Sequence, residues 1–239
     1  MPILDIYTSD DVLVHKYLGE WYFTPECLFN SVGWYNDQNT NMGSGLRFCN
    51  VTIPQGSTIN IAYLTFQCKE EDDAIVVRSK IVGEATDDAA VFPTLANYQA
   101  RRGTEVGGAN NNNRTVAEVL WDNIGAWVVG EYYDSPEIKT IIQEIVNRAG
   151  WVFGNSMVIW WDDHAGRSDN VTIRTVRYAE LGVYLHIEYT LPLSPRATQP
   201  IKDIVTLEAL RNIEMSATGR LYVNEEGKFV YESRYGRNP

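Results

Sequence analysis

The sequence is poor in positive charge. Its 239 residues include 20 Lys and Arg against 31 Asp and Glu, which gives a formal net charge of −11. Binding to nucleic-acid phosphates needs clustered Lys and Arg, and an anionic membrane surface attracts the same residues. The charge balance therefore argues against a nucleic-acid partner and against adsorption to an anionic membrane.

Long apolar runs are missing as well. No run approaches the roughly 18 apolar residues of a membrane-spanning helix, so we expect no membrane insertion. The first residues, MPILDIYTSDD, contain no basic segment followed by an apolar stretch. We therefore expect no signal peptide, and synthesis in a cytoplasm.

Cysteine is scarce, with only Cys27, Cys49 and Cys68, and no C-x-x-C pair occurs. An odd number without that spacing favours neither a disulfide framework nor a zinc site. Cys49 and Cys68 fall in strand-like runs, and we expect both to be small side chains of the core in a protein made under reducing conditions.

The common catalytic signatures are also absent. The chain has no HExxH, GxSxG or GxxxxGK[ST] motif, and its three histidines are far apart. Acidic pairs recur at 10–11, 72–73, 87–88 and 162–163, and we expect most of them to be solvated turn residues. We predict no catalytic residue and no cofactor, with Asp87 and Asp88 as candidate ligands of a structural calcium ion, which takes carboxylate oxygens.

Short β-branched and aromatic runs dominate what is present. They cover 12–14, 46–51, 59–67, 75–82, 116–121, 157–161, 171–178 and 183–189, each bounded by Gly, Pro, Asn or Asp. Alternation in 59–66 predicts Ile59, Ile61, Tyr63 and Thr65 on one face, whereas 157–161 is apolar on both faces and predicts a strand buried on two sides. The pattern predicts an all-β protein, a jelly-roll β-sandwich.

One embedded helix is expected near residues 135–149. Ser135 suits the N-cap, Pro136 the first helical position and Gly150 a left-handed C-cap. An apolar stripe follows at helical spacing, formed by Ile138, Ile141, Ile142 and Ile145. The helix should pack against the sandwich or close one end of it.

The character of the chain changes after Tyr189. We divide it into a sandwich (1–190), a Pro-rich linker (191–202) and a small helix-plus-hairpin module (203–239) with a helix at 203–217 and strands at 220–223 and 228–232. About forty residues cannot form a stable core alone, so the module should dock on a partner or fold back on its own sandwich. We predict an assembly interface made of Ile204, Leu207, Leu210, Ile213, Leu221, Val223, Phe229 and Tyr231.

Six segments of the sequence occur in the same order as matching segments of a known domain family. They are GLRF (45–48), VTIPQGSTI (51–59), AYLTF (62–66), GEATDDAA (83–90), IIQEIVNRAGW (141–151) and LHIEY (185–189). Over about residues 10–189 the chain thus resembles a DNRLRE-type or CBM96-like jelly-roll domain. TLEAL (206–210) and GRLYVNEEGKFVYESR (219–234) are similar to a segment of phage tail and minor structural proteins. Together the resemblances imply a phage-particle component, while members of the first family also occur on bacterial surface proteins, some of which bind polysaccharide.

Two functions therefore compete. The first is a non-enzymatic structural protein of a virion, in the tail, baseplate, fibre or capsid decoration, which we expect to act in assembly and in host attachment, with other virion proteins and copies of itself as partners. The alternative is a carbohydrate-binding module that recognises a cell-surface or environmental polysaccharide, at the cell surface or outside the cell. For the sugar platform we expect Trp21, Tyr22, Trp34 and Tyr35, because the N-terminal region is less regular and aromatic side chains are more easily exposed there.

Overall fold

The computed structural model describes residues 1–17, 20–25, 29–35, 40–68, 77–102, 113–163, 174–177, 182–192, 219–223 and 229–233. The chain divides into two compact units, Met1–Pro192 and Leu193–Pro239. Antiparallel strands make up most of the described part of each unit. None of the described helices is long and apolar enough to cross a membrane.

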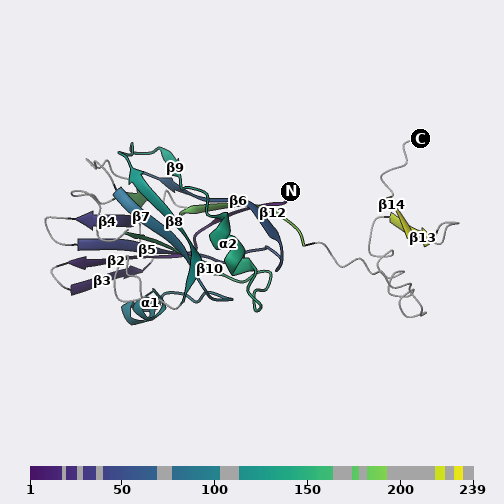
Figure 1. Ribbon diagram of the computed structural model, residues 1–239, viewed down its shortest axis with the longest axis horizontal. Coiled ribbons are helices and arrows are strands. Elements are labelled where there is room, and N and C mark those ends of the chain that lie inside the picture. Colours follow the sequence, from purple (N-terminus) through teal and green to yellow (C-terminus); the bar gives the residue numbers. More distant parts are fainter. Residues whose placement is uncertain are drawn as a thin grey trace. The chain divides into compact units, whose positions relative to one another are not determined.

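The first unit contains two antiparallel sheets (Figure 1). The four-stranded sheet has the order β1 (Ile3–Tyr7), β12 (Tyr184–Thr190), β6 (Thr58–Gln67) and β9 (Tyr132–Asp134). The eight-stranded sheet has the order β11 (Arg174–Arg177), β4 (Phe29–Tyr35), β5 (Thr40–Phe48), β10 (Met157–Asp163), β7 (Val77–Glu84) and β8 (Arg114–Ile124). Two further strands extend it beside β5, namely β2 (Asp10–Tyr17) and β3 (Glu20–Pro25).

The strand pairs are nested along the chain. The outermost pair is β1 with β12, then β5 pairs with β10, β6 with β9, and β7 with β8. Such a chain is one long antiparallel hairpin rolled into two facing sheets, which is the topology of a jelly roll. The predicted all-β sandwich is confirmed, and its nested pairing brings both ends of the first unit into one sheet.

Large apolar side chains fill the space between the sheets. The Phe66 ring of β6 lies 4.5 Å from the Trp161 ring of β10, measured between centroids, and Trp121 and Trp127 complete the aromatic cluster. Trp160, the neighbour of Trp161, belongs to a second apolar cluster on the outer side of the same sheet. Both tryptophans are fully buried, which confirms the prediction that this strand is buried on two sides.

Helix α2 (Lys139–Val146) packs its four buried side chains into the core, as predicted, but it begins later than the sequence suggests. Its N-cap is Ile138, which makes no side-chain cap bond. The predicted cap, Ser135, instead extends the edge of β6: its amide donates to the Leu64 carbonyl at 2.7 Å, and its Oγ accepts from the Leu64 amide at 3.0 Å. Pairing with the sheet therefore outcompetes the first helical turn.

The predicted C-cap was wrong too. The helix ends at Val146, and Asn147 is the C-cap in a right-handed conformation. Gly150 lies beyond the helix with no positive φ. It packs so closely against Asp87 that a Cβ there would overlap the carboxylate. Close approach, and not left-handed backbone, is therefore what requires glycine at this position.

A second helix, α1 (Leu95–Arg102), was not expected from the sequence. With the segment before it, it covers the outer side of the eight-stranded sheet, where Phe92 and Tyr98 pack on Trp160. Only two of its eight residues are buried, so its sequence, LANYQARR, shows little apolar periodicity. The Thr94 hydroxyl, which accepts from the Asn97 amide, is an N-cap signal that could have been recognised.

A β-bulge corrects the predicted face of β6. The register with β12 shifts between Glu188 and Tyr189, and Asn60 is the extra residue. Ile59 is consequently buried, while Ile61 lies 37% exposed on the other side of the sheet with Tyr63. The prediction that Ile59 and Ile61 share a face was therefore wrong.

In the second unit, β13 (Gly219–Val223) and β14 (Phe229–Ser233) form the predicted antiparallel hairpin. Its register pairs Leu221 with Tyr231 and Val223 with Phe229, which places these four predicted interface residues on one face. The predicted helix at 203–217, with Ile204, Leu207, Leu210 and Ile213, lies outside the described residues, as does most of the linker.

Candidate functional site

The outer face of the four-stranded sheet carries an unusual set of side chains. Along β12, Leu185 and Ile187 point into the core, so that Tyr184, His186 and Glu188 point outward. The other strands alternate in the same way. The outward residues of the four strands form what we call the aromatic–acidic face: Ile3, Asp5, Tyr7, Ile61, Tyr63, Thr65, Gln67, Tyr132, Asp134, Tyr184, His186 and Glu188.

The strand register aligns these residues in rows across the sheet. One row is Tyr7, Tyr184, Thr65 and Asp134; the next is Asp5, His186 and Tyr63; the third is Ile3, Glu188 and Ile61. Directly opposite residues on antiparallel strands lie within side-chain contact. Residues far apart in the sequence therefore form one continuous surface.

Contacts within the rows hold the rings in place. The rings of Tyr7 and Tyr184 lie 5.1 Å apart and are tilted by 59°, and those of Tyr63 and His186 stack at 4.8 Å. His186 Nδ1 lies 2.7 Å from a carboxylate oxygen of Asp5. A set of rings fixed by neighbours on three strands is pre-organised for a ligand, because little side-chain entropy remains to be lost on binding.

A negative field covers this face. Partial burial raises the pKa of Tyr184, and the hydrogen bond to Asp5 and its charge raise it further. The pKa of Tyr63 is raised by burial and then by the charges of Asp134, Asp5 and Glu188. Both phenols therefore stay protonated at neutral pH and can donate hydrogen bonds.

These groups are chemically suited to sugars. An aromatic ring has a negative face, which attracts the polarised C–H groups on the flat side of a sugar ring. Carboxylates accept hydrogen bonds from hydroxyl groups, and phenols donate or accept them. Tyr7 is 43% exposed and Tyr132 is 66% exposed, so both are accessible from solvent.

The four residues that the sequence suggested as a sugar platform lie elsewhere. Trp21 and Tyr22 are neighbours in β3 and point to opposite faces of the eight-stranded sheet. Trp21 packs against the cluster under α1, while Tyr22 is 45% exposed and stacks on His15 at 4.9 Å. Trp34 and Tyr35 are adjacent in β4, and the register puts Trp34 and Trp21 in one row, separated by β2 and β5.

The candidate calcium ligands make protein contacts. Asp87 accepts a hydrogen bond from Arg148 Nε at 2.7 Å, and Asp88 accepts one from the Ser156 amide at 2.8 Å. Within the part of the chain that the structure describes, no three His, Cys, Asp or Glu side chains are grouped as a metal site. Calcium binding there stays a prediction.

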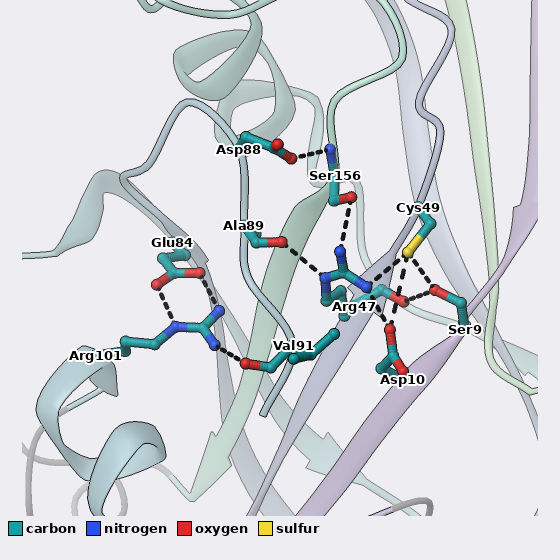
Figure 2. A network of polar contacts seen from close by, with 10 residues as sticks. All are labelled: Ser9, Asp10, Arg47, Cys49, Glu84, Asp88, Ala89, Val91, Arg101 and Ser156. Atoms are coloured by element: carbon teal, nitrogen blue, oxygen red, sulfur yellow. Dashed lines mark hydrogen bonds and ion pairs between the residues drawn. The ribbon is translucent and has the colours of Figure 1, made fainter. Parts of the chain in front are cut away.

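A polar network connects the α1 cover, that is, helix α1 and the segment before it, to the eight-stranded sheet (Figure 2). Arg47 of β5 contacts Asp10 and donates to the Ala89 carbonyl at 2.7 Å and to Ser156 Oγ at 3.0 Å. Arg101 of α1 donates two bonds of 2.7 Å to the Glu84 carboxylate. The network fixes the covering segment at both ends, so its role is structural.

Cys49 joins this network, which corrects the prediction that it is a core residue. It is partly exposed, and its Sγ lies 2.8 Å from Ser9 Oγ and also contacts Arg47. Cys68 is buried in the core, as predicted. Cys27 lies outside the described residues.

Two of the acidic pairs are not solvated as expected. Asp162 and Asp163, at the end of β10, are fully buried, and Asp162 forms ion pairs with Arg102 and Arg114. Asp11 is only 5% exposed. It accepts hydrogen bonds from Thr8 Oγ1 and Asn30 Nδ2, yet burial raises its pKa to about 7.

No protein-family model matches the chain, and no curated protein matches it.

The aromatic–acidic face was missed from the sequence, although part of its signal was visible. The run 184–189 alternates Tyr, His and Glu with Leu, Ile and Tyr, which indicates one apolar and one polar face. Asp5 and Asp134 gave no such signal, because they reach the face only through the pairing of β1 with β12 and of β9 with β6.

Proposed function

We propose that this chain is a non-enzymatic structural protein of a phage particle, and that its jelly roll attaches the particle to a polysaccharide. The observation that carries the attachment role is the aromatic–acidic face, on which three tyrosines and a histidine lie in aligned rows with three carboxylates. A pre-organised surface of this kind suits a linear sugar chain lying across the strands.

Binding without turnover suits the arrangement. Asp5 interacts with His186 and Tyr184, and Asp134 accepts from Thr65 Oγ1 at 2.6 Å. A glycosidase needs one carboxyl group with a raised pKa beside the scissile bond. Asp11, a carboxyl group whose pKa is clearly raised, is buried in the eight-stranded sheet, away from this face.

The particle role has different support. It derives from the resemblance of 206–234 to phage tail and minor structural proteins, and from the hairpin, which has four apolar or aromatic residues on one face. A short hairpin has two strand edges to which another strand can add. We therefore assign the second unit to assembly with other virion proteins or with copies of itself.

A glycan array with two matched variants tests the attachment role. Tyr7 and Tyr22 are almost equally exposed but belong to different sheets. We expect Tyr7→Ala to weaken polysaccharide binding about three- to tenfold, the usual contribution of one aromatic contact, and Tyr22→Ala to leave it unchanged.

Two results would contradict the proposal. Absence of binding to any polysaccharide would remove the attachment role. Loss of binding in Tyr22→Ala alone would move the site to β3, where the sequence first suggested it. Mass spectrometry of purified particles tests the virion role independently, because a particle component must be recovered with the other virion proteins.

A further inference from the structure

We propose that the aromatic–acidic face selects a polysaccharide that carries protonated amino groups, such as a polymer of deacetylated amino sugars. This inference rests on the proposed attachment role and specifies its ligand. The observation behind it is the charge of the face, taken together with its rings.

All the formal charge on this face is negative. Its three carboxylates are Asp5 on β1, Glu188 on β12 and Asp134 on β9, and none of the four strands contains a Lys or Arg. Beside β6, the Nζ of Lys139 lies 3.5 Å from the Asn60 carbonyl at the bulge and 3.9 Å from Glu137. It lies at the margin of the face and interacts with its own carboxylate.

Within the described part of the chain, no Lys or Arg compensates these carboxylates. Asp5 contacts His186 Nδ1 and the Tyr184 phenol, and Glu188 lies 3.5 Å from His186 Nε2. Asp134 accepts a hydrogen bond from the Thr65 hydroxyl group. One imidazole therefore faces two carboxylates, and at neutral pH a net negative charge remains for a ligand to neutralise.

An ammonium group complements both components of the face. It forms charge-assisted hydrogen bonds with carboxylates, and it is attracted to the negative face of aromatic rings. Tyr63 lies in the same row as Asp5, and Tyr184 lies in the same row as Asp134, so two of the three rows that contain a carboxylate also contain a ring. A polymer rich in carboxylate or phosphate would instead be repelled by the like charges.

Three probes of matched length separate the alternatives: a fully deacetylated glucosamine oligosaccharide, its fully N-acetylated counterpart and an oligouronic acid. In calorimetric titrations with the full chain at low salt, we expect the deacetylated probe to bind about tenfold more tightly than the acetylated one. We expect the uronic acid to bind least. The preference should shrink as salt is added, because screening weakens exposed ion pairs.

A double variant locates the preference. Asp5→Asn combined with Glu188→Gln should remove most of the preference while binding of the acetylated probe persists. Glu20→Gln changes an exposed carboxylate on β3 of the other sheet and should leave the preference intact.

The outcomes separate this inference from the proposed function. Equal affinity for the deacetylated and acetylated probes would overturn the charge selection and leave the attachment role standing. Preference for the uronic acid, or a preference that the double variant retains, would also overturn it. If none of the three probes binds, the inference fails, and the glycan array decides the attachment role separately.

Discussion

The buried carboxyl group of Asp11 should make the stability of the sandwich fall as the pH rises. Asp11 lies at the beginning of β2, opposite Leu46, and hydrogen bonds from Thr8 and Asn30 only partly offset the cost of burying its charge. Its pKa is raised from 3.8 to about 7. The folded protein therefore binds one more proton than the unfolded chain between about pH 4 and pH 7.

This linkage has a definite sign and size. The contribution of Asp11 to the free energy of unfolding is fully favourable below pH 3.8. It is lost as the pH rises through 7, because the charged form of the carboxyl group must then be buried. A shift of about 3 pKa units corresponds to about 4 kcal/mol at 1.36 kcal/mol per unit. Other carboxyl groups act in the same pH range, so the quantity to measure is the difference between the wild type and Asp11→Asn.

Asp11→Asn removes the titration while keeping an oxygen that can accept from Thr8 and Asn30. The free energy of unfolding of the variant, minus that of the wild type, should increase by about 4 kcal/mol between pH 4 and pH 8. Any effect of the amide group that does not depend on pH leaves this change unaltered. Urea unfolding followed by tryptophan fluorescence reports on the first unit, since all seven Trp residues lie within it. A difference that does not change with pH would refute the reasoning, and Glu20→Gln controls for the loss of one exposed charge.

Two further changes test the packing and the division into units. Gly45→Ala should destabilise the sandwich by about 1–3 kcal/mol, because a Cβ there would lie 2.8 Å from the Trp160 ring. In the control Gly125→Ala, the added Cβ meets no atom within 4 Å, so this variant should be as stable as the wild type. Equal melting temperatures for the two variants would contradict this reasoning. A chain ended after Pro192 should keep the Tm of the sandwich and lose incorporation into particles, and normal incorporation would show that the second unit is not the assembly element.

The strands that could be predicted are those whose burial leaves a local pattern. In β12 and most of β6, one face packs in the core, so apolar and polar residues alternate, and β10 is apolar throughout because both its faces are covered. Short strands such as β9, with three residues, are too short to show a period. Helix α1 escaped recognition because only Tyr98 and Arg102 are buried.

Other differences arise from competition that the local sequence does not show. Ser135 has the chemistry of an N-cap, but β6 offers its backbone a better partner at Leu64. The bulge at Asn60 depends on how β6 pairs with β12, and the alternation of residues within β6 alone could not reveal it. Aromatic residues near the N-terminus looked exposed because the packing of Trp21 depends on the distant α1 cover.

The candidate face was harder to predict than the fold. Its members come from residues 3–7, 61–67, 132–134 and 184–188, and only the nested pairing of a jelly roll brings these segments together. No single segment contains both the rings and enough carboxylates to indicate a binding surface.

Isoleucine methyl groups provide the most direct test of the attachment site. Ile3 and Ile61 lie on the aromatic–acidic face and are exposed, whereas Ile141 and Ile142 of α2 are fully buried. In NMR spectra of protein labelled at the isoleucine δ1 methyls, titration with the polysaccharide fragment found on the array should shift the Ile3 and Ile61 signals and leave those of Ile141 and Ile142 in place. Binding that leaves Ile3 and Ile61 unshifted would contradict the assignment of the site to this face.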